Sequence, residues 1–317
     1  MKIIKKLRKP ILITGATGFI GSNLVRYFVS NNIKVNILFK KSSNIWRIKD
    51  IIHKTKYFNL DLADKKKVAT IIKKIKPKTI FHLAAHGAYS YQENLYNIKS
   101  SILDGTINLL EECKKYNFEI FINTGSSSEY GFKNKKMKEK DILKPNSYYS
   151  VFKISSTLFC QFQSFFNNLQ IVTIRPFHVY GPYEEPRRLI PTLMSNMILN
   201  RKIKLVSPNI SRDLVYVTDV INFYILIASK KNLKGQVFNL GFGKKITINK
   251  IYNYLKKITK YKKKNKWNSM KDRLWDQTIW FSDMSYVKKQ LNWKPKINFK
   301  QGLKETLIWH RKFYNDK

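Results

Sequence analysis

Short apolar runs alternate with longer amphipathic stretches through the first 175 residues of the chain. The runs are rich in β-branched residues and predict six β-strands. We expect these strands at residues 11–14, 35–39, 57–59, 79–83, 120–123 and 171–174. Because nearly every position in these runs is apolar, both faces of each strand should be buried.

The stretches between the runs carry apolar residues at helical spacing. They predict helices at residues 19–30, 65–75, 95–115 and 148–168. Strands that alternate with helices in this way form a parallel sheet with crossover helices on both faces. The pattern therefore predicts an α/β fold with a doubly wound parallel sheet.

Beyond Pro176 the alternation loosens, and Pro182, Pro186 and Pro191 follow closely. Mixed elements are expected there, with helices at 189–199, 220–228, 248–258 and 301–313 and a strand at 213–217. We predict two domains, a sheet domain over 1–175 and a smaller mixed lobe over 176–317. The boundary is approximate, and the two lobes can interweave.

The chain of 317 residues has 61 Lys plus Arg against 20 Asp plus Glu, a net charge of +41. Only ten of the basic residues are Arg, and the lysines are spread over every segment. Specific DNA sites favour Arg, whereas scattered Lys gives unspecific attraction to phosphates. The charge thus favours a lysine-rich background without a specific nucleic-acid partner, and a selected polyanion site is the alternative.

The basic start of the chain precedes an apolar run, as in a signal peptide, but Thr14 and Gly15 end that run at once. No run of eighteen apolar residues occurs, so we expect no membrane span and a cytoplasmic location. Cys113 and Cys160 are too few for a disulfide framework in a chain of this length. Both have apolar neighbours and should be buried thiols.

The segment TGATGFIG, from Thr14 to Gly21, joins the first strand to the first helix. Gly15 permits a tight turn, Gly18 lets a pyrophosphate approach the backbone, and Gly21 allows close packing of helix and strand. A dinucleotide phosphate should therefore bind at the start of this helix. The expected cofactor contacts here are Gly15, Thr17, Gly18, Phe19, Ile20 and Gly21.

A Tyr and a Lys four residues apart, Tyr149 and Lys153, lie on one face of a predicted helix, and Ser126 follows a strand upstream. The ammonium would lower the pKa of the phenol by stabilising phenolate, and the serine hydroxyl would orient a substrate oxygen. This set indicates acid/base chemistry at a carbon that exchanges hydride. A packed aromatic is the alternative for Tyr149.

The glycine spacing and the ordered Ser, Tyr and Lys together resemble the extended short-chain dehydrogenase/reductase superfamily over nearly the whole chain. The resemblance implies a Rossmann-type dinucleotide-binding domain over 1–175 and a nucleotide-sugar-binding lobe over 176–317. It also implies the group of NAD(P)-dependent nucleotide-sugar epimerases, dehydratases and 4-ketoreductases. Ser126, Tyr149 and Lys153 take the catalytic roles, and no metal is expected.

The resemblance also bears on the cofactor. Phe39 stands where NAD-preferring relatives have Asp, and the cation of Lys40 that follows suits a 2′-phosphate, so NADP(H) is favoured and NAD(H) is the alternative. Further cofactor contacts implied by the resemblance are Asp61, Leu62, Leu83, Ala84 and Ala85. A homodimer through the helices at 95–115 and 148–168 is implied as well.

In the second lobe, the resemblance implies a nucleotide-diphosphate sugar as substrate. Arg212 and Arg273 correspond to the family's diphosphate-binding arginines, whose planar guanidinium matches diphosphate oxygens. His178 stands where many relatives have a substrate-contacting Asn, and a core histidine is its alternative. The expected substrate contacts are Ser127, His178, Leu189, Arg212 and Arg273.

The reaction is narrowed by the residues after Ser126. Relatives that remove water across C5 and C6 have an Asp-Glu pair there, whereas this chain has Ser127 and Ser128, so 4,6-dehydration is disfavoured. Glu129, one position further, leaves some room for it. We expect a 4-keto-6-deoxyhexose reductase acting at C4, with a 4-epimerase that retains NAD as the alternative. The alternative that is not an enzyme is a protein that senses the cofactor or binds polyanions without catalysis.

Overall fold

Seven strands form the central sheet in the computed structural model, which describes residues 4–89, 91–133, 135–270 and 279–315. Their order across the sheet is β10-β6-β5-β4-β1-β2-β3. The strands are β1 (Ile11–Thr14), β2 (Asn36–Phe39), β3 (Lys56–Asn59), β4 (Thr79–His82), β5 (Ile120–Thr124), β6 (Ile171–Pro176) and β10 (Val237–Leu240). The pairs from β3 to β6 are parallel. This sheet confirms the predicted Rossmann-type α/β fold.

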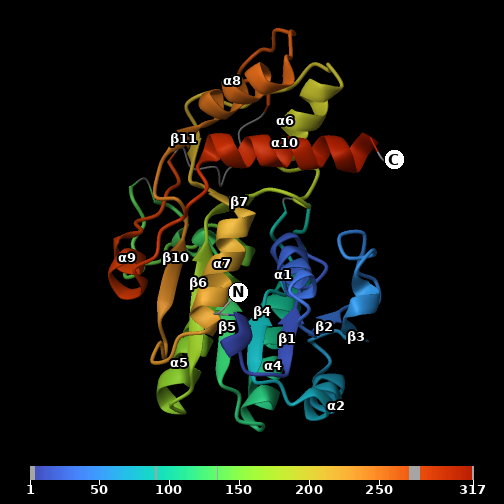
Figure 1. The fold of residues 1–317 in the computed structure, drawn as a ribbon. Coiled ribbons are helices and arrows are strands. Elements are labelled where there is room, and N and C mark those ends of the chain that lie inside the picture. The colour runs from blue at the N-terminus through green and yellow to red at the C-terminus, as the bar shows by residue number, and fades with distance from the viewer. Residues whose placement is uncertain (1–3, 90, 134, 271–278, 316–317) are drawn as a thin grey trace. The chain divides into compact units, whose positions relative to one another are not determined.

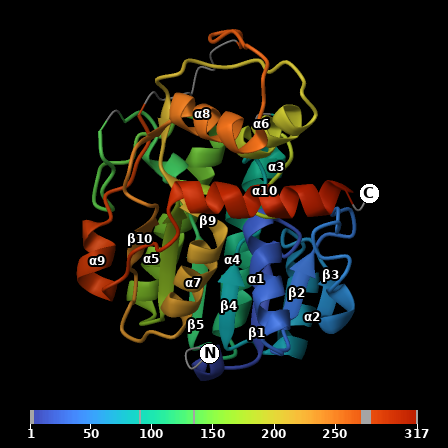
Figure 2. The same ribbon diagram turned by 45° about the horizontal axis from the view of Figure 1, so that its top comes forward.

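Strand β1 lies between β2 and β4 (Figure 2). The chain thus adds β2 and β3 on one side of β1 and then β4, β5 and β6 on the other side. Such a reversal of direction leaves a crevice beyond the carboxyl ends of the strands, where open α/β sheets bind ligands. The residues that follow β1 and β4 are therefore placed at the position where a dinucleotide is expected. The glycine-rich turn follows β1 directly.

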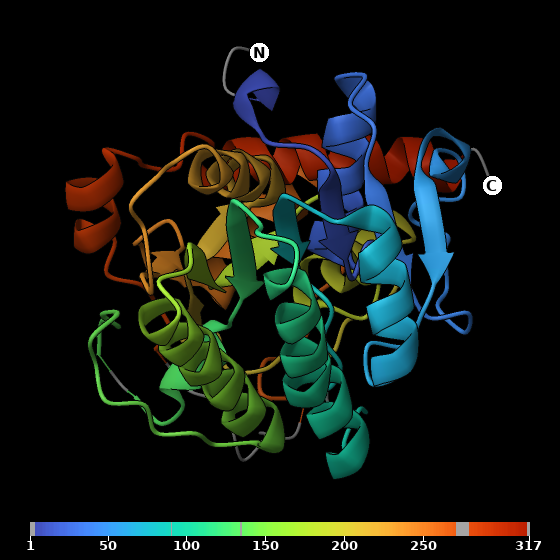
Figure 3. The same cartoon turned by 90° about the horizontal axis from the view of Figure 1, so that it is seen from below.

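Helices cover both faces of the sheet. Figure 3 shows α4 and α5 side by side on one face and α1 and α7 on the other. The helices of the chain are α1 (Phe19–Ser30), α2 (Lys65–Ile75), α3 (Leu95–Lys99), α4 (Gly105–Lys114), α5 (Tyr148–Phe166), α6 (Leu189–Ile198), α7 (Val217–Ala228), α8 (Ile248–Thr259), α9 (Ser285–Leu291) and α10 (Phe299–Asn315). No helix of the described residues is long and apolar enough to cross a membrane.

The two faces of the sheet bury different side chains. Under α2, α4 and α5 the core is mainly aliphatic and includes Cys113 and Cys160, which confirms that both thiols are buried. Under α1 and α7 it is aromatic, with Phe81 packed between Phe28 and Tyr224. Burial raises the pKa of both thiols, so they stay protonated and unreactive at neutral pH.

The predicted helix over 95–115 is broken by a π-helical turn, η3 (Ser100–Asp104), between α3 and α4. Lys99 and Asp104, five residues apart, form an ion pair of 2.8 Å across this turn. Residues five apart face one another in a π-turn but not in an α-helix. The amphipathic pattern continues through the turn, so no sequence signal predicts the extra residue.

The chain divides into two compact units. Unit 1 comprises Met1–Gly131, Ile142–Pro176 and Ile221–Phe238, and unit 2 comprises Phe132–Asp141, Phe177–Val220 and Asn239–Lys317. Unit 1 thus includes α7 from Ile221 onward, a segment beyond the first 175 residues. Strand β10 follows α7 and extends the sheet beside β6, and the sequence pattern did not predict this strand.

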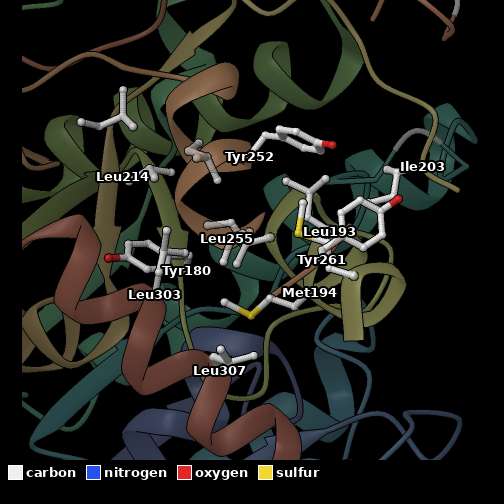
Figure 4. Packing of buried hydrophobic residues seen from close by; sticks show 14 of the residues in the cluster. Tyr180, Leu193, Met194, Ile203, Leu214, Tyr252, Leu255, Tyr261, Leu303 and Leu307 are labelled. Carbon is white, nitrogen blue, oxygen red and sulfur yellow. The ribbon is translucent and has the colours of Figure 1, made fainter. Parts of the chain in front are cut away.

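Unit 2 is built around helices α6, α8 and α10, which lie together in Figure 1. Its strands form two small ladders, β7 (His178–Tyr180) parallel to β9 (Leu214–Tyr216) and β8 (Ser211–Arg212) antiparallel to β11 (Ile246–Thr247). Its core combines Leu and Met with Tyr180, Tyr252 and Tyr261 (Figure 4). The Tyr180 hydroxyl donates a hydrogen bond to the Phe299 carbonyl at 3.4 Å, which ties β7 to the start of α10.

Candidate active site

The glycine-rich turn at the end of β1 is packed against the chain that follows β4. Gly15 has a φ of +68°, and a Cβ atom there would lie 2.6 Å from the Ala84 nitrogen. The Gly18 N–H donates to the Gly15 carbonyl at 3.0 Å and closes the turn. Only glycine combines this backbone conformation with this close approach at Gly15.

The outer side of the turn is open where a cofactor phosphate is expected. A Cβ atom at Gly18 would have a single neighbour within 4 Å, the Gly15 carbonyl oxygen at 3.2 Å. Gly18 is also the N-cap of α1 and supplies no side-chain acceptor to the helix. The positive end of the helix dipole and its first N–H groups thus face a position that an anion can approach. These features fit a dinucleotide pyrophosphate.

Lys40 and Asp61 meet at the ends of β2 and β3. The Lys40 Nζ lies 2.9 Å from Asp61 Oδ2, and both side chains are nearly half exposed. The adjacent Phe39 is buried and stacks on Tyr57, with 5.8 Å between the ring centroids. Two residues that were predicted to contact the cofactor separately therefore form one ion pair. Burial, together with the Lys40 charge, lowers the pKa of His86.

A buried hydrogen-bonded chain runs from the glycine-rich turn to α5 through His82, the last residue of β4. His82 Nδ1 lies 2.8 Å from Thr14 Oγ1, and its Nε2 lies 2.9 Å from Thr106 Oγ1 in α4. Thr106 Oγ1 is in turn 3.1 Å from Ser156 Oγ in α5. Burial and the nearby Lys153 charge lower the pKa of His82 to about 3, so the imidazole is neutral.

The proton positions in this chain follow from its other partners. The Ala84 N–H already donates to Thr14 Oγ1, and the Thr106 hydroxyl donates to the Ile102 carbonyl within the π-turn. Thr106 therefore accepts from His82, which places the imidazole proton on Nε2, and Thr14 donates to Nδ1. This neutral histidine fixes the turn after β1 relative to the helices behind the site.

Lys153 and Tyr149 lie one turn apart in the first half of α5. The Lys153 Nζ donates to the Thr124 carbonyl at the end of β5, at 2.7 Å, and lies 5.9 Å from the centre of the Tyr149 ring. Lys153 is 4 % exposed, whereas Tyr149 is partly exposed. The structure therefore brings together the Tyr and Lys that were predicted to act as a pair. Burial lowers the pKa of Lys153 to about 8, and the negative charge of Glu129 opposes that shift.

Ser126 is the N-cap of the short helix η4 (Ser127–Tyr130), which packs against α5. Its Oγ accepts the Ser128 N–H at 3.1 Å, and its own N–H donates to Glu129 Oε1 at 2.8 Å. This is a capping box, in which a serine and a glutamate three residues later satisfy each other's backbone. Ser126 is partly exposed and Ser127 is buried.

In unit 2, the predicted substrate residues lie on β7, β8 and α6. Burial and the charges of Arg188 and Arg212 lower the pKa of His178 to about 3, so its imidazole is neutral. The His178 Nε2 is buried and has no hydrogen-bond partner in the structure. Leu189 is the first residue of α6, and Arg212 donates to the Ser211 carbonyl. Arg273 lies outside the described residues.

The sequence analysis did not predict the contacts of three residues that surround Ser126 and Lys153, although it considered Glu129 for dehydration. Thr124 supplies the acceptor for Lys153, Glu129 holds the Ser126 N–H, and Arg175 pairs with Glu129. The spacing of Ser126 and Glu129 is a capping-box signature and could have revealed that contact. Arg175 and Thr124 lie on separate strands, so only the fold brings them here.

Among the described residues, no group of three His, Cys, Asp or Glu side chains could hold a metal ion. The polar groups that lie together between β5 and α5 include the buried Lys153 ammonium, the Tyr149 phenol and the Ser126 hydroxyl. Such a set can hold and transfer a proton at a substrate oxygen.

Comparison with known proteins is consistent with this site. Residues 11–241 match the model of the NAD dependent epimerase/dehydratase family. The chain is 28 % identical to the UDP-glucuronate 4-epimerase of Thermodesulfobacterium geofontis, covering 95 % of each chain. It is similar to the crystal structure of the UDP-glucose 4-epimerase of Thermotoga maritima with UDP-glucose, with a TM-score of 0.88, 26 % identity and coverage of 96 % and 99 %.

A dTDP-glucose 4,6-dehydratase of Bacillus anthracis, solved in complex with NAD, gives a TM-score of 0.84 at 26 % identity and covers 96 % of this chain and 97 % of its own. The relatives thus include both epimerases and dehydratases. The family match spans the glycine-rich turn, the Ser, Tyr and Lys set, and the sheet that positions them. The chain therefore belongs to the NAD dependent epimerase/dehydratase family.

Proposed function

We propose that the protein is an NAD(P)-dependent nucleotide-sugar oxidoreductase that acts at C4 of the hexose, with Ser126, Tyr149 and Lys153 as its catalytic residues. One observation carries this proposal. The buried Lys153 ammonium is held by the Thr124 carbonyl at 2.7 Å, and the ring of the more exposed Tyr149 lies beside it. A cation fixed beside a phenol that the substrate can reach makes that phenol an acid/base group.

Ser126, Tyr149 and Lys153 have different roles at the C4 oxygen. The nicotinamide ring, when bound, supplies hydride exchange at the C4 carbon. Tyr149 takes the proton from a C4 hydroxyl or returns it to a 4-keto oxygen, and Lys153 stabilises the phenolate form. Because Ser126 Oγ accepts the Ser128 N–H, its own hydrogen can be donated to the same substrate oxygen.

The glycine-rich turn and the ends of β2, β3 and β4 supply the cofactor contacts. Gly18 and the N-terminus of α1 would hold the pyrophosphate, and Lys40 and Asp61 would face the adenosine end. The remaining proposed contacts are Gly15, Thr17, Phe19, Ile20, Gly21, Leu62, Leu83, Ala84 and Ala85, together with Tyr149 and Lys153.

In unit 2, His178 and Arg212 are the proposed contacts to the substrate, with Leu189 beside the nucleotide. Ser127, in unit 1, is the further proposed contact to the sugar. The neutral imidazole of His178 is suited to a hydrogen bond with a sugar hydroxyl, and the Arg212 guanidinium to a diphosphate. Arg273 is proposed for the diphosphate on the sequence resemblance alone.

Two forms of C4 chemistry fit these residues. Epimerisation with retained NAD is favoured by the similarity to UDP-glucose and UDP-glucuronate 4-epimerases. Reduction of a 4-keto-6-deoxyhexose with NADPH is favoured by Phe39 in place of an Asp and by the Lys40 cation next to it. The ion pair with Asp61 weakens the second argument, because Lys40 already has an anionic partner.

Dehydration across C5 and C6 is the least supported form. Ser127 and Ser128 replace the acid pair that this reaction needs, and Glu129 is fully buried in an ion pair with Arg175. A carboxylate in that position cannot exchange protons with a substrate. We therefore place dehydration below the other two.

The experiment uses purified protein and a panel of nucleotide hexoses and nucleotide 4-keto-6-deoxyhexoses. Inversion at C4 without added cofactor, with NAD released on denaturation, supports the epimerase. Consumption of NADPH or NADH that requires a 4-keto sugar supports the reductase. Absence of turnover in every arm, with polyanion binding that weakens steeply with salt, would sink the enzyme proposal in favour of a binding protein.

We also propose a homodimer through the helical face of α3, α4 and α5. Aromatic side chains of α5 are exposed there, including Phe162 and Phe166, which stack with 5.3 Å between ring centroids, and Phe165, which is 66 % exposed. Burying such a patch against a second copy removes apolar surface from water. Sedimentation as a monomer at micromolar concentration contradicts this proposal.

A further inference from the structure

Glu129 and Arg175 form the most deeply buried ion pair of the described residues. The Arg175 Nε lies 2.8 Å from Glu129 Oε2, and the two side chains are 3 % and 0 % exposed. Desolvation of two charges offsets most of their attraction, so such a pair gives little net stability over apolar residues of the same size. Its location directly behind Ser126 suggests a role in the site.

The Glu129 carboxylate uses its two oxygens for two different elements. Oε1 accepts the backbone N–H of Ser126, and Oε2 accepts the Arg175 Nε from β6. Gly125 makes room for this arrangement, because a Cβ atom there would overlap Glu129 Oε1. The backbone of Ser126 is thereby tied to the central sheet through a single carboxylate.

Arg175 is itself held at its far end. Its Nη1 donates to the Tyr130 hydroxyl at 3.2 Å, and its Cζ lies 4.9 Å from the centre of the Tyr130 ring. Tyr130 is fully buried. The guanidinium therefore has a fixed orientation, and it holds the carboxylate in one place.

The same carboxylate acts on Lys153 through its charge. The groups that face the Lys153 ammonium are Glu129 from η4, His82 from β4, and Tyr149 and Cys160 from α5. His82 and Cys160 are neutral at pH 7, because burial lowers the pKa of the first and raises that of the second. Glu129 is thus the anion that favours the charged form of Lys153.

We propose that Glu129, held by Arg175, is a positioning residue for the C4 chemistry, which fixes the Ser126 backbone and keeps an anion near the Lys153 ammonium. This inference rests on the proposed roles of Ser126, Tyr149 and Lys153. It assigns Glu129 no direct contact with substrate. It also explains why a glutamate so close to the catalytic serine is not a dehydration acid.

The test compares Glu129→Gln, the double variant Glu129→Gln with Arg175→Met, and Glu112→Gln. The single variant leaves the Arg175 charge buried without an anionic partner and is expected to be destabilised. The double variant removes both charges but keeps an amide oxygen for the Ser126 N–H. Glu112 is the matched control, because it is 5 % exposed and pairs with Lys115 at 2.7 Å on α4.

We expect the double variant to be folded by circular dichroism and to lose kcat about ten- to a hundredfold at unchanged KM. Its activity should also begin to fall at a lower pH than in the wild type, because Lys153 loses its proton more easily. The Glu112→Gln control should keep the wild-type kcat and pH profile. A merely structural pair predicts a folded double variant with wild-type kcat and pH profile, and that result overturns the inference.

Arg175→Lys provides the answer if the double variant does not fold. It keeps the charge but loses the fork that contacts Glu129 and Tyr130 together, so a lower kcat at unchanged KM is expected. Wild-type kcat in Arg175→Lys contradicts the positioning role. A wild-type protein that turns over no nucleotide sugar contradicts the proposed function itself, which separates the two failures.

Discussion

Two ion pairs near the carboxyl ends of the strands have nearly the same length and very different surroundings. Lys40 and Asp61 lie 2.9 Å apart with side chains 45 % and 44 % exposed. Arg175 and Glu129 lie 2.8 Å apart with side chains 3 % and 0 % exposed. Water screens the first pair and solvates each partner when it opens, whereas the second cannot open without leaving a buried charge.

The difference assigns the two pairs to different tasks. The exposed pair can open and exchange partners, as its proposed contact with a ribose or phosphate requires. The buried pair is a fixed support, and it holds the backbone of Ser126, a proposed catalytic residue, in place. The two ion pairs thus have nearly equal distances but different roles, because only one of them is buried.

The largest expected contrast between the two pairs is in stability. Glu129→Gln should lower the free energy of unfolding by about 3–5 kcal/mol, because it leaves the Arg175 guanidinium buried without a carboxylate to balance its charge. Asp61→Asn, the matched substitution in the exposed pair, should change it by about 0–1 kcal/mol. Urea unfolding of both variants measures the contrast. Similar losses in the two variants would remove the distinction that burial makes here.

The second contrast is in pH dependence and concerns the buried cation Lys153. Since burial lowers its pKa to about 8, activity should decline as pH rises through about 8, because a neutral amine no longer stabilises phenolate. The contribution of Lys153 to the free energy of unfolding changes with pH in the opposite direction to activity. Between pH 8 and the ordinary lysine range, the unfolded chain binds more protons than the folded one, so the free energy of unfolding rises with pH.

Both pH dependences can be tested on the wild type and on Lys153→Met. Activity and urea unfolding are measured from pH 7 to 10. The variant should lack the pH-dependent gain in stability that Lys153 gives the wild type. A wild-type protein whose activity is flat to pH 10 contradicts a lowered pKa at Lys153.

The smallest effect is expected at the exposed cation. Lys40→Ala should weaken binding of NADP(H) by about tenfold relative to NAD(H), because one exposed charge is worth about 1.4 kcal/mol or less toward a 2′-phosphate. Isothermal titration with both dinucleotides measures the ratio, and Lys41→Ala is the neighbouring control. If the ratio of the affinities for NADP(H) and NAD(H) is unchanged, Lys40 only forms the ion pair with Asp61, and the preference for NADP(H) is unsupported.

Much of the sheet and its helices could be predicted because most strands are short apolar runs bounded by clear turns. The expectation that both faces of each strand are buried was wrong for β3, whose residues Lys56, Tyr57 and Asn59 are exposed because this strand lies at the edge of the sheet. Helices α1 and α2 begin and end at the predicted residues. Strand β10 was not predicted, because its four residues, Val237 to Leu240, include an Asn and have no flanking apolar pattern. Its place beside β6 depends on α7 crossing the sheet, which no local signal records.

The proximity of Tyr149 and Lys153, two of the proposed catalytic residues, could be predicted for a similar reason, since helical spacing alone links them. The contacts of Thr124 and Arg175 could not be predicted, because these residues lie on two separate strands, whereas the capping-box spacing of Ser126 and Glu129 is visible in the sequence. The positive charge of the chain gave little guidance, since abundance does not show which lysine is buried. Lys153 is distinguished by its burial and by its contact with the Thr124 carbonyl.

The most direct test of the account follows C4 of a nucleotide hexose or its 4-keto form by NMR, with wild-type protein and with Tyr149→Phe. The phenylalanine keeps the ring beside Lys153 and removes only the hydroxyl that exchanges the proton. We predict turnover by the wild type and a loss of about 10²- to 10⁴-fold in the variant, at similar cofactor binding. Equal turnover by the two proteins would contradict the proposed role of Tyr149.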